Sequence, residues 1–151
     1  MTRSDREEGT RWLRQASSDF EGIAALRAAG KHDLACFLAQ QAAEKALKAY
    51  LYARGVDLVH THSVASLCET CARYDTAFSA LRRRIKHLDT YYVEARYPNA
   101  LPDSLPCEFF DEADSATASL YAAEALEAVR KALEGPEAAV PEEGGGASLP
   151  K

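Results

Sequence analysis

Residues 33–54 read DLACFLAQQAAEKALKAYLYAR, and this stretch decides the fold. It contains neither proline nor glycine, and its alanines and leucines are the residues that favour a helix. Apolar residues occur on more than one side of that helix, which is typical of the central helix of a bundle. We expect Asp33 to cap its start and Gly55 to end it.

The flanking sequence keeps the same helical spacing. A first helix is predicted over residues 10–29, ended by Gly30, and Ser63 opens a shorter third helix. A fourth helix is predicted to continue until the Arg96-Tyr97-Pro98 segment, because a proline excludes the residue before it from the helical region. The fifth spans about 108–134. The inward positions expected in the last two helices are Phe78, Leu81, Ile85, Leu88 and Tyr92, then Phe109, Ala113, Ala116, Leu120, Ala123 and Val129 or Arg130.

The composition agrees with an all-α bundle of four long helices and one short one. Of 151 residues, 29 are alanine and 16 leucine, whereas valine and isoleucine together supply only 8, which argues against a large sheet. The net charge is -5, but residues 11–134 carry 15 basic and 17 acidic side chains. This near balance excludes a uniformly basic nucleic-acid surface.

The ends of the chain differ from its centre. Half of the glycines and half of the prolines fall in residues 135–151, which we predict to be a disordered tail. Residues 1–9 are polar and are expected to be flexible, so the folded domain is predicted over 10–134. The chain has no apolar stretch long enough for a membrane span and no apolar core near Met1 for a secretory signal, so we expect a cytoplasmic protein.

Four cysteines are expected to be reduced in that compartment. Cys68 and Cys71 have a C-x-x-C spacing, but no second pair completes a zinc site, and packing as small hydrophobic residues is the favoured interpretation. We predict no metal and no cofactor.

Three polar segments could carry a function. In the second helix, Glu44 and Lys48 stand one turn apart, beside Gln40, Gln41 and Lys45. A solvated helix face with one salt bridge explains this spacing equally well. His62 precedes the third helix, where a histidine more often caps or packs than acts in chemistry. Arg96 lies at the proline-forced break, where it could bind phosphate or tie down the chain.

In this order the segments resemble the HEPN domain family of small helical prokaryotic proteins. The resemblance begins with Trp12-Leu13-Arg14-Gln15-Ala16-Ser17-Ser18-Asp19-Phe20 and continues with the aromatic residue and QQAAEKALKA run of the second helix. Thr61-His62, Tyr92 and Ala95-Arg96-Tyr97-Pro98 complete it. The Gln-Gln-Ala-Ala-Glu-Lys-Ala-Leu-Lys run is the specific part of this match.

The resemblance implies a five-helix, largely up-and-down bundle that is commonly dimeric and has a proposed nucleotide-binding role. Many family members accompany a minimal nucleotidyltransferase in two-component, toxin–antitoxin-like pairs. Others are metal-independent RNases with an Arg-x4–6-His motif, in which histidine transfers protons and arginine stabilises phosphate.

Arg82 and His87 formally match the RNase motif. On a regular helix, however, residues five apart lie roughly 140° apart around the axis, so both could reach one phosphate only if the helix were irregular or a second subunit contributed. The subgroup with Arg-Tyr-Pro, which the chain resembles more closely, generally lacks a recognisable RNase motif.

The favoured interpretation is therefore a binding module. Its predicted site binds a nucleotide, or a nucleotide-loaded partner transferase, through residues chosen for phosphate neutralisation and base stacking: Lys45, Lys48, His62, Arg96 and Tyr97. The alternatives are an RNase or toxin that uses Arg82 and His87 on RNA, and a purely structural dimerisation scaffold. We expect a homodimer, because the second helix has more apolar surface than one core stripe needs.

Overall fold

The computed structural model describes residues 1–135, and these form α-helices, short 3-10 helices and loops with no strand. Residues 136–151, and with them most of the predicted tail, lie outside the described residues. The α-helices are α1 (Arg3–Ala28), α2 (His32–Ala53), α3 (Val64–Ala72), α4 (Ala77–Ile85), α5 (Pro106–Phe109) and α6 (Glu112–Glu134). The 3-10 helices are η1 (Lys86–Tyr91) and η2 (Pro98–Ala100). The all-α prediction is confirmed.

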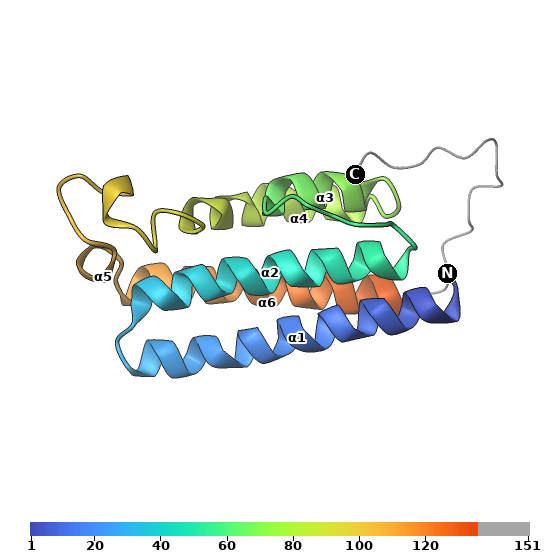
Figure 1. Ribbon diagram of the computed structural model, residues 1–151, viewed down its shortest axis with the longest axis horizontal. Coiled ribbons are helices and arrows are strands. Elements are labelled where there is room, and N and C mark those ends of the chain that lie inside the picture. The colour runs from blue at the N-terminus through green and yellow to red at the C-terminus, as the bar shows by residue number, and fades with distance from the viewer. Residues whose placement is uncertain (136–151) are drawn as a thin grey trace.

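Helix α2 occupies the centre of the bundle (Figure 1). α1 runs away from the N-terminal end of the molecule, and α2 returns beside it. α6 lies along α2 and runs in the same direction, while α3 packs on another side of α2 and α4 packs against α3 and α6. The central position predicted for residues 33–54 is thus confirmed.

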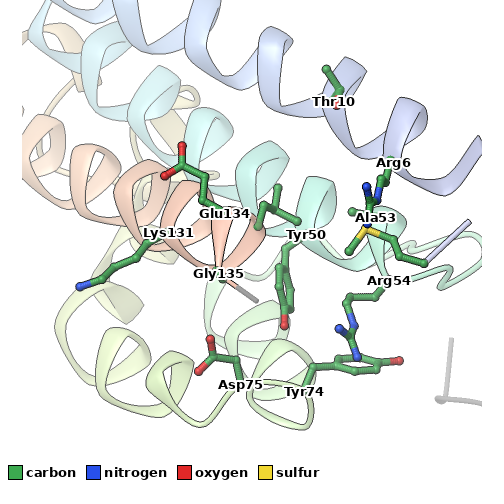
Figure 2. Close-up of a pocket in the computed structure, with 13 residues that line it drawn as sticks. Arg6, Thr10, Tyr50, Ala53, Arg54, Tyr74, Asp75, Lys131, Glu134 and Gly135 are labelled. Carbon is green, nitrogen blue, oxygen red and sulfur yellow. The ribbon is translucent and has the colours of Figure 1, made fainter. Parts of the chain in front are cut away.

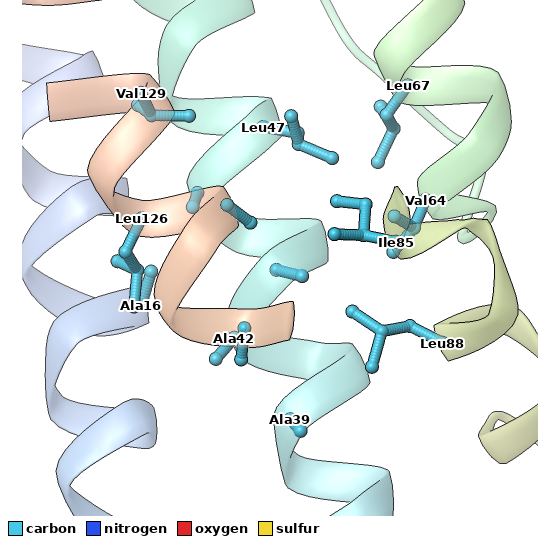
Figure 3. Packing of buried hydrophobic residues seen from close by; sticks show 14 of the residues in the cluster. Ala16, Ala39, Ala42, Leu47, Val64, Leu67, Ile85, Leu88, Leu126 and Val129 are labelled. Atoms are coloured by element: carbon cyan, nitrogen blue, oxygen red, sulfur yellow. The ribbon is translucent and has the colours of Figure 1, made fainter. Parts of the chain in front are cut away.

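Both sides of α2 are buried within the chain. Figure 3 shows Leu126 and Val129 of α6 on one side, and Leu67 and Ile85 from α3 and α4 on the other. The apolar surplus of α2 is thereby accounted for inside the bundle, so it no longer supports a homodimer through this helix.

The helix ends agree with the sequence at most positions. Gly30 and Gly55 adopt φ angles of 73° and 83°, the left-handed conformation that favours glycine after a helix. Ser63 caps α3 by accepting a hydrogen bond from the Ser66 backbone. The prediction for Asp33 was wrong: Lys31 precedes α2 without a side-chain cap, and Asp33 lies in the first turn. α1 begins earlier than expected, at Arg3, because Thr2 and Asp5 form a capping box.

The fourth helix is shorter than predicted. α4 ends at Ile85, and η1 and a series of turns carry the chain to Arg96. The Asp89 carboxylate accepts hydrogen bonds from the Val64 and Ala65 backbone at 2.6 and 3.0 Å, which ties η1 to the start of α3. Tyr97 is extended, with φ -123° and ψ 129°, as Pro98 requires. The extended residue before Pro98 was therefore predicted correctly. The regular helix, however, already ends at Ile85, before η1.

Most inward positions of the last helix were predicted in the wrong register, although Val129 is buried as expected. Phe109 and Leu120 are each 55% exposed, and Ala113 and Ala116 are exposed as well. The buried residues of α6 are Ser115, Ala118, Ala122, Ala125, Leu126 and Val129. Alanine occurs on every side of this helix, so its spacing does not select a face, and Phe109 belongs to α5 and not to α6.

The structure also tests the predictions for the cysteine pair, for metal ligands and for membrane spans. Cys68 and Cys71 are fully buried among apolar residues, and burial raises the pKa of Cys68 to about 12. They pack as the small hydrophobic residues that the sequence suggested. Within residues 1–135, no group of three or more potential ligands could hold a metal ion, and no helix is long and apolar enough to cross a membrane.

Candidate functional site

A charged pair lies almost entirely inside the protein at the middle of α2. The Lys48 ammonium is 3.4 Å from one oxygen of Glu44, and their side chains are only 6% and 5% exposed. The predicted pairing is confirmed, but the alternative of a solvated salt bridge is wrong. Buried charges require partners, because their desolvation costs several kcal/mol per ion.

The second oxygen of Glu44 holds His62, which lies on the loop before α3. His62 Nδ1 is 3.1 Å from Glu44 Oε1, and its imidazole is 57% exposed. Because an ionised carboxylate only accepts hydrogen bonds, it is Nδ1 that donates to Glu44, and Nε2 takes no part in this contact. The ring stacks on Tyr92, with centroids 5.2 Å apart and planes 14° from parallel. Its orientation is therefore fixed from two directions.

The backbone of the His62 loop is also held from both sides. Gln40 of α2 donates a hydrogen bond to the His62 carbonyl at 2.8 Å. Asp89 of η1 accepts a hydrogen bond from the Ser63 hydroxyl at 3.0 Å, in addition to those from the two backbone N–H groups of α3. A histidine on a loop is thus positioned by side chains of a helix and of η1.

Arg96 lies in a cage of aromatic rings. Its guanidinium carbon is 4.3 Å from the centroid of Phe37, 4.6 Å from Tyr92 and 5.0 Å from Tyr97. Arg96 Nε donates a hydrogen bond to the Tyr92 carbonyl at 2.6 Å. The sequence left open whether this arginine ties down the chain or binds a ligand. The hydrogen bond from Nε ties down the chain, which is the structural role. The two terminal nitrogens of the guanidinium remain as further donors.

Four of the five predicted residues belong to one series of contacts. Lys48 contacts Glu44, Glu44 contacts His62, His62 stacks on Tyr92, and Tyr92 stacks on Arg96, which also lies on the half-exposed ring of Tyr97. We call the residues of this series the His62 cluster: Glu44, Lys48, His62, Tyr92, Arg96 and Tyr97. The structure brings together residues from α2, the 54–63 loop and the turn after η1.

Lys45 is placed elsewhere. It forms an ion pair with Asp19 of α1 and lines a pocket between α1 and α2. That pocket has a volume of about 640 Å³ and is lined by Glu8, Arg11, Trp12, Arg14, Gln15, Ser18 and Lys45. Lys48 connects it to the His62 cluster, because its ammonium also lies 6.0 Å from the centre of the Trp12 ring.

Sequence reasoning missed the residues that position this site. Glu44 was assigned only to a salt bridge, Tyr92 to the core of a helix, and Asp89 and Gln40 to no functional role. A polar Gln40 and Glu44 one turn apart on an otherwise buried helix were a usable signal, since buried polar groups need partners. Asp89 had no local signal, because its contacts are distant in sequence.

A second pocket lies at the end of the bundle where α1 begins and α6 ends (Figure 2). It has a volume of about 510 Å³, and Tyr50, Arg54, Tyr74, Asp75 and Lys131 are among its lining residues. Arg54 caps the C-terminus of α2, and Lys131 lies in the last turn of α6. Positive charge at helix C-termini is favourable in itself, so these cations do not require a ligand. None of the predicted site residues lines this pocket.

The residues of the RNase alternative lie in α4 and η1. The chain leaves the regular helix after Ile85, which is the irregularity that a joint use of Arg82 and His87 requires. Arg82, however, is paired with Glu69 of α3 at 3.0 Å. His87 is exposed on η1.

The fold and the site together define a small helical bundle with a polar, aromatic-lined cluster around its central helix. The HEPN domain family matches residues 10–134, and the chain belongs to that family. The crystal structure of TT1696 from Thermus thermophilus is similar, with a TM-score of 0.76 and 31% identity over 82% of this chain and 97% of that one. The structure of ST0689, described as an archaeal HEPN homologue, has a TM-score of 0.69 and 28% identity over 84% of this chain and 98% of its own. No curated protein matches the chain.

Proposed function

We propose that this HEPN protein is a binding module that holds a nucleotide, a minimal nucleotidyltransferase partner, or both, in a two-component toxin–antitoxin-like system. The proposed site is the His62 cluster together with Lys45. A homodimer remains part of this proposal as a family expectation, with no interface assigned to it.

The observation that carries the proposal is the convergence of three predicted residues, His62, Arg96 and Tyr97, on one partly exposed surface, with the fourth, Lys48, buried beneath His62. Lysine and arginine side chains neutralise phosphate, and an arginine presents paired donors to it. His62 offers an oriented Nε2 at the same place, and the half-exposed Tyr97 ring offers a flat surface for a base. This combination of groups suits a ligand with both phosphate and a flat ring.

The buried pair of Glu44 and Lys48 supports a functional interpretation. Replacing a buried ion pair by apolar residues is often neutral or stabilising. Stability alone is therefore a weak explanation for the presence of such a pair. Here the pair also fixes the orientation of an exposed histidine.

Nucleotide binding can be tested by calorimetric titration with ATP at fixed salt. We expect measurable binding, and we expect His62→Asn to weaken it at least several-fold. His60→Asn is the matched control, because His60 is exposed on the same loop and makes none of these contacts. Absence of binding by the native protein, or equal effects of the two variants, would reject the nucleotide assignment.

The partner assignment requires a separate experiment. The minimal nucleotidyltransferase encoded nearest to this chain would be co-expressed with it and purified through a tag on one component. Recovery of a stoichiometric complex that is lost in Arg96→Ala, with the variant still folded by circular dichroism, is the expected result. Recovery of the tagged chain alone would reject this partner.

RNA cleavage through Arg82 and His87 is the alternative function. The irregular backbone after Ile85 favours it, whereas the pairing of Arg82 with Glu69 opposes it. If it is correct, metal-free RNase activity disappears in His87→Ala while nucleotide binding persists. The binding module predicts no RNase activity in either protein.

A further inference from the structure

The pocket between α1 and α2 has the chemistry of a phosphate site. Its lining includes the cations Arg11, Arg14 and Lys45, against the single carboxylate of Glu8. Its volume of about 640 Å³ lies within the range of roughly 300–1,000 Å³ that is typical of small-molecule sites. Because positive groups from both helices face one hollow, an anion is the ligand that this pocket favours.

Two of the three cations of this pocket, Arg11 and Arg14, can be released to a ligand, whereas Lys45 is paired with the partly buried Asp19. Arg11 is paired with Glu8, but both side chains are exposed, at 77% and 42%, and exposed pairs contribute little to stability. Arg14 is exposed and forms no hydrogen bond or ion pair within the described part of the chain. Arg14 is therefore the cation with the least to lose when a phosphate binds.

Trp12 gives the same pocket a flat apolar wall. The indole is held in place: its Nε1 donates to Glu8 at 3.0 Å, and its ring packs on Tyr52 at 5.0 Å between centroids. An aromatic ring that is held rigidly beside cations is suited to a base or sugar next to a phosphate.

A series of side-chain contacts through the buried Lys48 links the wall of the pocket to the His62 cluster. The Lys48 ammonium lies 6.0 Å from the Trp12 ring centre and 3.4 Å from Glu44, whose other oxygen contacts His62. Lys45, one of the five residues predicted from sequence, lies on the pocket side of this connection.

We propose that the α1–α2 pocket is the phosphate subsite for a mononucleotide, with Arg11, Arg14 and Lys45 around the phosphates and Trp12 against the adjoining sugar or base. This inference rests on the proposed nucleotide binding and adds Trp12, Arg11 and Arg14 to that site. A mononucleotide is the chosen ligand because the hollow is of single-ligand size.

Trp12 makes the test direct, because it is the only tryptophan in the chain. The full-length protein would be titrated with AMP, ATP, tripolyphosphate and a short single-stranded oligonucleotide. Tryptophan fluorescence and calorimetry would be recorded on the same samples. We expect ATP to change the Trp12 emission with the same midpoint as the calorimetric titration, and to bind more tightly than AMP.

A pair of matched variants completes the experiment. Arg14→Gln should weaken ATP binding at least fivefold and reduce its salt dependence. Arg83→Gln is the control, because Arg83 is an exposed arginine of α4 and does not line the pocket. Trp12→Phe keeps an aromatic ring and should retain binding by calorimetry while losing the fluorescence signal.

The outcomes separate this inference from the function on which it rests. Calorimetric binding of ATP without a change in Trp12 emission, and without an Arg14 effect, would overturn the subsite and leave the nucleotide function standing. No binding of ATP by the native protein would overturn both. Much tighter binding of the oligonucleotide than of ATP would overturn the choice of a mononucleotide.

Discussion

Two parts of the α2 surface are buried in opposite ways. Near its C-terminus, Ala49 and Ala53 face Gly9 of α1 so closely that a Cβ added to the glycine would lie 2.6 Å from Ala53 Cβ. At its middle, Glu44 and Lys48 bury charges beneath His62. The first contact demands only small side chains, whereas the second demands particular partners. This difference separates the part of α2 that holds the bundle together from the part for which a function is the better explanation.

The largest expected effect comes from breaking the buried ion pair. Glu44→Ala should lower the free energy of unfolding by about 3–5 kcal/mol, because Lys48 would keep a buried charge without its counterion. The measurement is denaturant unfolding with linear extrapolation. The matched double variant, Glu44→Leu with Lys48→Met, should be near neutral or more stable and should lose nucleotide binding. If the single and double variants were equally unstable, the pair would be a structural requirement.

Truncation of the apolar core should have a similar or slightly smaller effect. Leu47 is fully buried between α2, α3 and α4, so Leu47→Ala should cost about 2–5 kcal/mol. Leu38 lies on the same helix but is only partly buried, and Leu38→Ala should cost less. If Leu47→Ala and Leu38→Ala lost equal stability in thermal and in denaturant unfolding, the exposure of the two side chains would not determine the cost of truncation.

The close contact of α1 and α2 predicts a third, smaller effect. Gly9→Ala should cost about 1–3 kcal/mol through overpacking, since its new Cβ would also lie 2.9 Å from the Ala49 carbonyl oxygen. Gly22→Ala is the control on the same helix, where the nearest atom is a movable Leu38 methyl at 3.1 Å. Because alanine favours a helix over glycine by up to about 1 kcal/mol, this control should be neutral or stabilising. A destabilised Gly22→Ala with an unchanged Gly9→Ala would contradict the packing.

The sequence was sufficient where one residue type decides a local structure. The glycines at positions 30 and 55 marked the ends of the first two helices, Ser63 marked the start of the third, and Pro98 required an extended Tyr97. Each of these effects acts within a few residues along the chain. The central position of α2 was equally accessible, because its apolar residues cover more than one side.

The sequence was insufficient where distant residues decide. Nothing near Asp89 shows that it will hold the start of α3, and α4 therefore looked like one long helix. In α6, alanines on all sides hid the true inward face, whose buried Ser115 accepts a hydrogen bond from Arg27 and is hydrogen-bonded to His32 Nδ1. The same limit applies to the site: residue types suggested Lys48, His62, Arg96 and Tyr97, but Tyr92 joins them only in three dimensions.

The smallest expected change in stability concerns Arg96, and it requires two measurements together. The substitution Arg96→Lys keeps the positive charge among Phe37, Tyr92 and Tyr97 but loses the hydrogen bond from Nε to the Tyr92 carbonyl. One hydrogen bond of this kind contributes about 0.5–1.5 kcal/mol, so a loss of stability in that range is expected whatever the function.

Affinity is therefore the decisive measurement for Arg96. At a temperature well below the unfolding transition, nearly all of the variant is folded, and its lower stability cannot by itself weaken binding. A purely structural Arg96 then predicts unchanged affinity for ATP in Arg96→Lys. If the terminal nitrogens of Arg96 bind phosphate through a planar fork, lysine cannot reproduce that geometry, and affinity should fall several-fold. Because the charge is retained, the salt dependence of binding should stay the same while the affinity falls. A fall in salt dependence would instead indicate that the lysine has left the cage.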